Sequence, residues 1–384
     1  MKKSRLLILL LAIIAGINIS DAQVTKDAQD LYDQGLQLKE DRKVKEALEK
    51  FKLAIAKNSG FADALYQAGW CQNDLGNYND AIEYLRRARQ PWSLIPKVHF
   101  ELGYAFEKSG NTDSAIKCYN RCIDLKPAYA NAYKQLGFIA HFKGDYAAAL
   151  AYYKKYELYA ASNLLTDYLY WYRKGFAFNA TGDYANAKVT LQKSLHFKPD
   201  YINTQLELGY ASNKMKQAQD AIDHFKKAIE LDPKNYVAYN GIAEVYLDNM
   251  KDADQAMVWY GKSLAVEPTE RKANFGMGFC LNSKQKFSEA VNYLKKAIEK
   301  EPSYAAAYTE LGFSYFKTGK DADAESQFIK ALKISPKNEN TLYYACLLYI
   351  KQKNKAKAQK MLNELKAISS KNAAALQPKV KALK

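Results

Sequence analysis

A small residue recurs along this chain at a nearly constant spacing, and this repetition constrains the fold more than any other feature of the sequence. Glycine fills eight of the ten positions, and successive positions are 34 or 35 residues apart except for one step of 38. The ten residues are Gly35, Gly69, Gly103, Gly137, Gly175, Gly209, Ala243, Gly278, Gly312 and Cys346. A period of about 34 residues is typical of structural repeats that stack on one another.

Two further residue types repeat with the same period. Alanine follows the small residue after twelve positions in nine repeats, and after thirteen in one. Four positions later a large apolar residue follows, namely Phe51, Leu85, Tyr119, Tyr153, Leu191, Phe225, Tyr260, Leu294, Phe328 and Leu362. A spacing of four places alanine and the apolar residue on one helix face. Small residues let two helices approach closely, and the large side chain fills the space between them.

Each repeat also contains signals that end one helix and begin another. Glycine followed by asparagine or aspartate at 76–77, 110–111, 144–145 and 182–183 offers a left-handed stop and a capping side chain. Proline closes six repeats and prevents the second helix from continuing. The pattern therefore predicts two antiparallel helices per repeat. One pair cannot bury its apolar face alone, so neighbouring pairs are expected to stack.

On these residues the sequence resembles the tetratricopeptide repeat family, with ten repeats across residues 28–372. The residues that match the family pattern best include Leu136, Gly137, Tyr146, Ala149 and Tyr153. The resemblance implies an all-α fold, a right-handed superhelical α-solenoid of about ten helix-turn-helix units. Residues 23–27 are a short lead before the repeats, and residues 373–384 are a basic tail after them.

Two irregularities interrupt the period. Repeat seven, at residues 236–270, has Ala243 in place of glycine and gains a residue near Met250. Four extra residues separate repeats four and five, within a tyrosine-rich stretch. We therefore expect a bend at residues 157–167.

Residues 1–22 have the layout of a secretory signal. Basic residues precede an apolar run over residues 6–17, and Ser20 and Ala22 supply small residues for processing. About a dozen apolar residues are too few to cross a bilayer core of about 30 Å as a helix. We expect cleavage after Ala22, which leaves no transmembrane span, and an uncleaved anchor is the alternative. The signal is similar to those of exported proteins of Gram-negative bacteria, so the expected location is the periplasm, with peripheral attachment to the outer membrane as an open variant.

Little in the sequence favours catalysis or a cofactor. It contains no P-loop, no HExxH zinc-binding sequence and no complete dinucleotide-binding glycine pattern. The chain has only five cysteines, an odd number that cannot all pair, so a disulfide framework is not expected. The four histidines are scattered along the sequence. We therefore expect buried free thiols, no metal, no cofactor and no enzymatic activity. An export signal also separates the chain from most nucleic acid, so we expect no nucleic-acid partner.

The family resemblance implies that the first helix of each repeat lines a concave surface. The position one residue after the recurring small residue is aromatic in seven of ten repeats. Aromatic residues also occur three positions before it, and asparagine occurs four positions after it in four repeats. These offsets share one helix face. The candidate binding residues are Tyr66, Trp70, Asn73, Phe100, Tyr104, Phe138, Tyr172, Phe176, Asn179, Tyr210, Asn213, Phe275, Phe279, Asn282 and Phe313.

Exposed rings along a groove are unusual on a soluble surface unless a partner covers them. We therefore expect a scaffold whose aromatic groove binds peptide segments or partner proteins, with asparagines that hydrogen-bond an extended backbone. Two alternatives stay open. In one, the rings pack mainly against one another along the inner wall. In the other, the groove binds carbohydrate, as in scaffolds for the export or assembly of an envelope polysaccharide.

Positive charge is concentrated at the C-terminal end. The formal net charge is +16, and removal of the signal leaves +14. Residues 351–384 contain ten lysines and one acidic residue, so +9 of this charge lies in the last 34 residues. One interpretation is docking on an anionic envelope surface or an acidic partner. The other is a solvated cap on the final repeat, which a solenoid needs.

Overall fold

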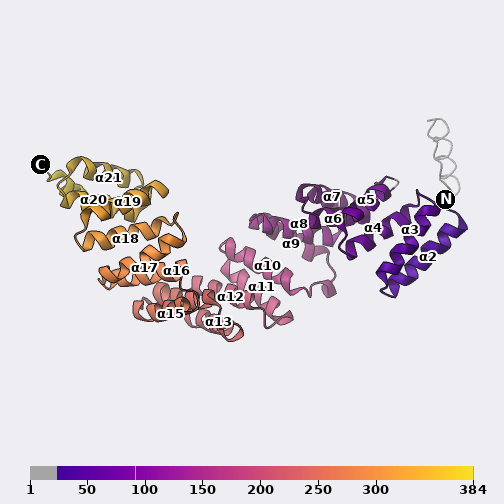
Figure 1. The fold of residues 1–384 in the computed structure, drawn as a ribbon, viewed down its shortest axis with the longest axis horizontal. Helices are drawn as coiled ribbons and strands as arrows, with labels where there is room; N and C mark the ends of the chain where they lie inside the picture. The colour runs from indigo at the N-terminus through magenta and orange to yellow at the C-terminus, as the bar shows by residue number, and fades with distance from the viewer. Residues whose placement is uncertain (1–23, 91, 384) are drawn as a thin grey trace. The chain divides into compact units, whose positions relative to one another are not determined.

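The computed structural model describes residues 24–90 and 92–383, and every regular element in these ranges is helical (Figure 1). The all-helical repeat fold predicted from the sequence is therefore confirmed. The predicted secretory signal lies outside the described residues. The chain divides into two compact units between Thr166 and Asp167. This boundary falls in the stretch where the sequence predicts a bend, and the bend itself stays a prediction.

Unit 1 contains four helix pairs within its described residues. They are α2 (Lys26–Glu40) and α3 (Val44–Lys57), α4 (Ala62–Asp74) and α5 (Tyr78–Arg89), α6 (Pro96–Lys108) and α7 (Thr112–Leu125), and α8 (Ala130–Phe142) and α9 (Tyr146–Tyr159), followed by the short 3₁₀ helix η1 (Ser162–Leu164). Each first helix packs on its own second helix, and that second helix packs on the next pair. The buried face therefore continues from pair to pair.

Unit 2 contains six helix pairs and one further helix in its described residues. They are α10 (Tyr168–Ala180), α11 (Tyr184–Phe197), α12 (Ile202–Lys214), α13 (Ala218–Leu231), α14 (Tyr236–Val245) with the π-helical turn η2 (Tyr246–Met250), α15 (Ala253–Val266), α16 (Arg271–Ser283), α17 (Phe287–Lys300), α18 (Ala305–Lys317), α19 (Asp321–Ile334), α20 (Glu339–Lys351), α21 (Lys355–Ala367) and α22 (Asn372–Lys381). Across both described ranges, no helix has the length and hydrophobicity that spanning a bilayer requires.

The turns inside the pairs follow the predicted chemistry. The glycines at 76, 110, 144 and 182 have φ angles between 78° and 85°, in the left-handed region that glycine adopts easily. The backbone N–H of the next residue donates to a carbonyl five residues earlier, as from Asn77 to Gln72 at 2.8 Å. The side chains of Asn111, Asp145 and Asp183 also accept a backbone N–H of the second helix, whereas the side chain of Asn77 does not.

The core is built on the contact between the recurring small residue and the large apolar residue. All ten large residues are buried, at 5% exposure or less. A Cβ atom added to Gly137 would lie 2.5 Å from the ring of Tyr153. The ring of Phe225 lies between two glycines, because added Cβ atoms would lie 2.7 Å from it at Gly209 and 2.5 Å from it at Gly241. Glycine therefore recurs because the large facing side chain, a ring or a leucine, occupies the space that a Cβ atom would need.

Repeat seven accommodates its extra residue in the π-helical turn η2. Helix α14 ends at Val245, the turn follows, and Lys251 then takes a φ of 57°. A π turn adds one residue to a helical turn without breaking the helix. Asn249 in this turn donates from Nδ2 to the backbone oxygen of Asn213 at 2.9 Å. The insertion that the sequence places near Met250 is thus fixed to the preceding repeat.

Most of the residues assigned to a basic tail form helix α22, which packs on α20 and α21. Ala373, Leu376 and Val380 are buried, whereas Lys379 and Lys381 are exposed. The helix covers an apolar face of the pair α20 and α21. The C-terminal end is therefore a packed cap with lysines on its outer surface.

The five cysteines are free thiols, and all five are buried. Burial raises the pKa of Cys71, Cys280 and Cys346 to about 11. These thiols stay protonated at neutral pH and act as small apolar side chains in the core.

Candidate functional site

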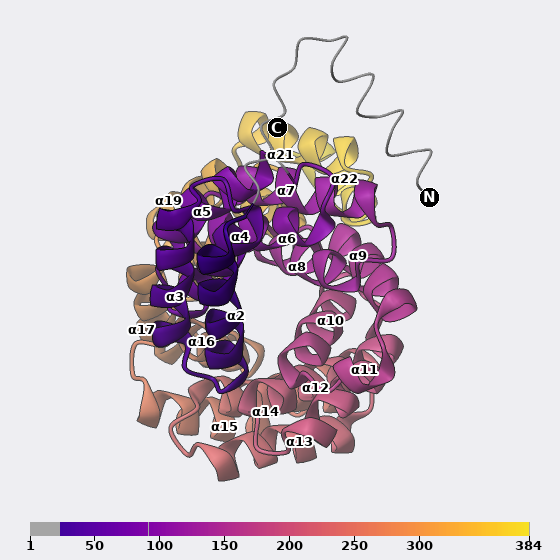
Figure 2. The same cartoon turned by 90° about the vertical axis from the view of Figure 1, so that its right-hand side faces the viewer.

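The first helix of each pair lies on the inner side of its unit (Figure 2). In unit 1 the inner helices are α2, α4, α6 and α8, with α3, α5, α7 and α9 outside them. In unit 2, α10, α12, α14 and α16 lie inside and α11, α13, α15 and α17 outside. The recurring aromatic positions therefore belong to the inner helices of each unit.

The predicted binding rings differ in how far they reach the surface. Tyr210 and Phe279 are each 38% exposed. Seven other rings are half-buried, namely Trp70, Phe100, Tyr104, Tyr172, Phe176, Phe275 and Phe313. The inner faces therefore combine open rings with rings that the protein covers in part.

Two of the predicted rings do not lie on an open surface. Phe138 is 9% exposed and meets the ring of Tyr153 edge-on, with 6.1 Å between centroids. Tyr66 is equally buried and lies 6.0 Å from the ring of Trp92. Both rings are occupied by packing within unit 1, so neither belongs to the candidate binding surface.

The rings three positions before the small residue also have partners within the protein. The pairs are Phe100 with Tyr129 at 5.2 Å, Tyr172 with Tyr201 at 5.2 Å, and Phe275 with Tyr304 at 4.9 Å between centroids. In each pair the second ring belongs to the residue just before the next first helix. These rings therefore help to hold neighbouring repeats together.

Three groups of five residues repeat one arrangement on the inner faces. Each group takes an aromatic residue and an asparagine from one first helix, the aromatic first residue of the following second helix, and a glutamate and an aromatic residue from the next first helix. We call the groups modules A, B and C. Module A is Trp70, Asn73, Tyr78, Glu101 and Tyr104; module B is Phe176, Asn179, Tyr184, Glu207 and Tyr210; module C is Phe279, Asn282, Phe287, Glu310 and Phe313. The five residues of each module line one cavity, of about 440 Å³ in A, 780 Å³ in B and 420 Å³ in C.

In each module the asparagine amide binds the glutamate of the next repeat. Asn179 donates from Nδ2 to the backbone oxygen of Glu207 at 3.0 Å and to its Oε2 at 2.8 Å. The matching distances are 3.0 and 3.0 Å in module A and 3.0 and 2.8 Å in module C. The sequence predicts that these asparagines hydrogen-bond a ligand backbone, but their donors are occupied within the protein. Asn213 belongs to no module, and its backbone carbonyl oxygen accepts from Asn249.

The side-chain oxygens of the module asparagines, unlike their amide donors, are not all hydrogen-bonded within the protein. Asn73 and Asn179 are 6% and 5% exposed, and the Oδ1 atom of each has no hydrogen-bond partner. In module C, Oδ1 of Asn282 accepts from Ser314 Oγ at 2.7 Å. Modules A and B therefore each contain a buried acceptor that the protein does not satisfy, which is costly unless another group supplies a donor.

Two of the three aromatic residues of each module meet edge-on. The centroid distances are 6.4 Å between Tyr78 and Tyr104, 6.0 Å between Tyr184 and Tyr210, and 5.8 Å between Phe287 and Phe313. A lysine one helical turn further along lies over the second ring each time, at 5.3, 5.3 and 5.6 Å for Lys108, Lys214 and Lys317. The same geometry in three places indicates a repeated structural element rather than three chance contacts.

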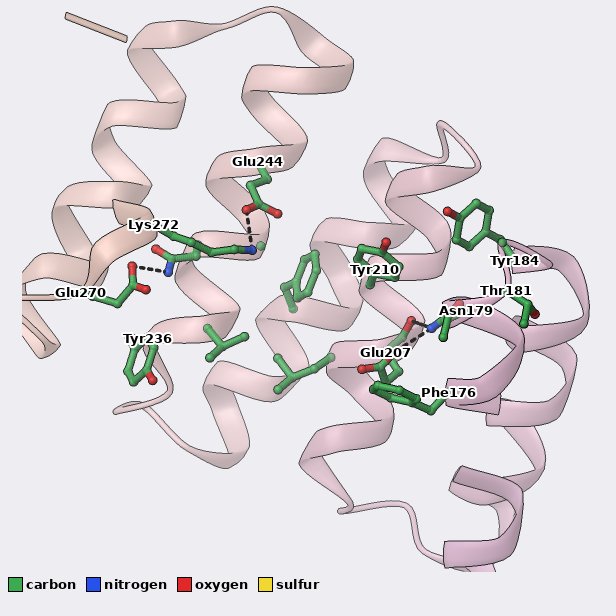
Figure 3. Close-up of a pocket in the computed structure, with 17 residues that line it drawn as sticks. Phe176, Asn179, Thr181, Tyr184, Glu207, Tyr210, Tyr236, Glu244, Glu270 and Lys272 are labelled. Carbon is green, nitrogen blue, oxygen red and sulfur yellow. Dashed lines mark hydrogen bonds and ion pairs between the residues drawn. The ribbon is translucent and has the colours of Figure 1, made fainter. Parts of the chain in front are cut away.

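The cavity of module B is the largest of the three and continues onto helices α14 and α16 (Figure 3). Figure 3 shows Glu207 with Phe176 on one side and Tyr210 on the other, while Asn179 reaches it from the neighbouring helix. The ionisable lining also includes Glu244, Glu270 and Lys272. Lys272 Nζ lies 2.9 Å from Glu244 Oε1, and Asn240 Nδ2 donates to Glu270 Oε2 at 2.9 Å. Oδ1 of Asn240 is a further buried acceptor without a partner.

Burial determines the electrostatics of the module glutamates. It raises the pKa of Glu101, Glu207 and Glu310 above the ordinary carboxyl value, and the hydrogen bond from the module asparagine offsets this rise only in part. Each carboxylate is therefore held in the groove at a cost to stability. No group of three or more His, Cys, Asp or Glu side chains in the part of the chain that the structure describes is placed to hold a metal ion.

We expect Glu207→Gln to raise the free energy of unfolding at neutral pH. The folded pKa of Glu207 lies above its ordinary value of 4.5, so the folded state binds more protons than the unfolded state as pH rises from that value to the folded pKa. Stability falls with rising pH across this window, and a neutral side chain removes the loss. Urea unfolding measured from the ordinary value of 4.5 up to neutral pH tests this. A variant less stable than the wild type at neutral pH would contradict it.

Sequence reasoning missed the glutamate and the first residue of the second helix in every module. A signal was present, because glutamate follows the module asparagine by 28 positions in all three cases. The fourth asparagine, Asn213, has Gly241 at that position and forms no module. Among these four asparagines, a glutamate 28 positions later distinguishes the three module asparagines from Asn213.

Comparisons with known proteins identify repeats of one kind along the chain. Family profiles described as tetratricopeptide or TPR repeats match residues 32–94, 96–129, 168–201, 212–274, 278–319 and 305–338. Anaphase-promoting complex subunit 3 of Schizosaccharomyces pombe is 24% identical over 192 residues, which cover 50% of this chain and 28% of that protein. BBSome complex member bbs-4 of Caenorhabditis elegans is 23% identical over 286 residues, which cover 72% of this chain and 61% of that protein. This chain thus spans less than two thirds of either relative.

The same architecture recurs among solved structures. The crystal structure of the APC/C hetero-tetramer Cut9-Hcn1 aligns with 94% of this chain and 78% of that chain. The TM-score is 0.52 and the sequence identity is 18%. This likeness concerns the fold of stacked helix pairs and says nothing of shared partners.

Proposed function

The chain belongs to the tetratricopeptide repeat family, and from this premise we propose that it is a non-enzymatic scaffold in the periplasm of a Gram-negative bacterium. The inner faces of its units hold extended peptide segments of partner proteins. The fold implies protein partners, because stacked helix pairs present a long inner surface instead of one closed active site.

The recurrence of the module is the observation that carries this proposal. Its rings stay partly open, with Tyr210 at 38% exposure. Burying one such ring contributes about 1.5 to 3 kcal/mol, and ordering a flexible segment offsets much of the sum. Micromolar affinity is the expected result.

The proposed location and envelope contact rest on the sequence and on the C-terminal cap. The signal layout of residues 1–22 supports export to the periplasm. Exposed Lys379 and Lys381 on α22, within the lysine-rich end, support a second contact with an anionic envelope surface. This contact is separate from the inner face and uses charge alone.

The lining of the module B cavity favours peptide over an acidic polysaccharide as the groove's ligand. Aromatic faces stack on sugar rings as well as on peptide side chains, so the rings alone do not separate the two. Glu207, Glu244 and Glu270 line the cavity, and they repel a polymer of uronic acids. Fluorotyrosine placed at position 210, which lines the cavity, is therefore expected to show no saturable change in its fluorine NMR signal on titration with alginate.

Photo-crosslinking in cells tests the proposed function. A photoreactive phenylalanine analogue at Tyr210 is expected to form adducts with a periplasmic partner, because this ring reaches the inner surface. Mass spectrometry should map each adduct to an extended segment of that partner. The same analogue at Val258, which is 50% exposed on the outer helix α15, serves as the matched control. Equal adducts at both positions, or none at Tyr210, would refute the groove proposal.

A further inference from the structure

Building on the proposed function, we propose that the cavity of module B binds a cationic side chain, lysine or arginine, of the extended partner segment. The cavity lies within unit 2, between first helices α10, α12, α14 and α16. It lies apart from the basic C-terminal cap, which bears the opposite charge.

The charged side chains that line this cavity are mainly anionic. Three glutamates face it, and the one lysine in the lining, Lys272, is already bound to Glu244 at 2.9 Å. Asn179 and Asn240 are 5% and 3% exposed, and the Oδ1 atoms of both lack a partner. Ammonium and guanidinium groups have only donors, so they satisfy such a lining, whereas a carboxylate, which has only acceptors, does not.

The aromatic residues that line the cavity also favour a cationic ligand. Phe176 and Tyr210 line the cavity together with Glu207, so a cation beside this carboxylate also lies near aromatic rings (Figure 3). Rings attract cations through their negative faces, and the attraction strengthens when water is excluded. Lys214 already lies 5.3 Å from the centroid of Tyr210, which shows that this ring accepts a cation on one face. The aliphatic part of a lysine or arginine side chain would cover the remaining apolar wall.

The positive net charge of the chain limits where a cationic segment can bind. The chain has a formal charge of +16 and repels polycations at long range. Binding of a cationic segment therefore requires a local anionic site, and the module B cavity provides one. Modules A and C contain the same glutamate in smaller cavities and are secondary positions for further cationic side chains.

The test uses the purified protein with fluorotyrosine at position 210, so that fluorine NMR reports on this cavity alone. The probes are end-capped peptides of alternating alanine with lysine, with glutamine or with glutamate. We expect the lysine peptide to shift the position 210 signal saturably, the glutamine peptide to bind about ten-fold more weakly, and the glutamate peptide to cause no shift. Glu207→Gln should lower the affinity for the lysine peptide by about ten-fold.

Glu230→Gln is the matched control, because it removes the same charge from an exposed position on the outer helix α13. It should change the affinity by less than about two-fold. Equal binding of the lysine peptide to the wild type and to Glu207→Gln would overturn the proposal. So would a glutamine or glutamate peptide that binds as well as the lysine peptide, although the proposed peptide groove would survive that result. If no peptide shifts the signal and the cross-linker at Tyr210 forms no adduct, both proposals fail.

Discussion

Phe225→Ala is expected to lower the free energy of unfolding by about 3 to 5 kcal/mol, because it empties a site that two repeats share. The ring is 5% exposed and lies between Gly209 of α12 and Gly241 of α14. Neither glycine has a side chain that can move into the space. The loss should therefore approach the upper end of the range, since the cavity cannot collapse.

The effect of Phe225→Ala should be local as well as large. Each repeat contacts only its neighbours, so a damaged contact opens the adjacent repeats first. Hydrogen exchange should rise in α12 to α14 and change little in α20 and α21, and urea unfolding should give the total loss. Val258→Ala removes methyl groups from a half-exposed outer side chain and should stay within about 0.5 kcal/mol. Uniform exchange along unit 2 would contradict this account.

The double substitution Phe176→Ala and Tyr210→Ala is expected to weaken binding of the partner segment by about a hundred-fold. Both rings line the module B cavity, and Tyr210 is among the most open rings of the candidate set. Truncating partly exposed rings leaves no large void, so helicity should be retained. Affinity for the cross-linked segment, made as a synthetic peptide, gives the readout, with circular dichroism as the check on folding.

A matched double substitution separates binding from general damage. Val189→Ala and Val258→Ala remove apolar side chains that are 58% and 50% exposed on outer helices of the same unit. This variant should bind the segment like the wild type. An equal loss of affinity in both double variants would mean that the inner face has no special role in binding.

Much of the fold could be predicted because its contacts are local and periodic. The glycine at 137 and the tyrosine at 153 are sixteen positions apart, and each repeat restates the same pair. The positive φ angles at the predicted glycines follow from turn chemistry that a dipeptide reveals. The π-helical turn and the helical form of the C-terminal end were not predicted, because each depends on packing against an earlier repeat.

The site could be predicted only in part. The sequence identifies the inner helix face and most of its rings, yet it does not distinguish Phe138 from Phe176, which occupy the same position in their repeats. Phe138 is buried against Tyr153, whereas Phe176 lines a cavity. The burial of one ring and the accessibility of the other are set by packing between helices and not by position in the repeat.

The sequence by itself determined the repeat and its two helices, because these follow from spacing along one chain segment. The face that turns inward was implied by the family resemblance. The tertiary structure alone decided which groups meet across repeats. It joined Asn179 to Glu207, left Asn179 Oδ1 without a partner, and combined three glutamates with five aromatic residues in one cavity. Such groups meet only when neighbouring helices pack at a particular distance and rotation, which no single segment encodes.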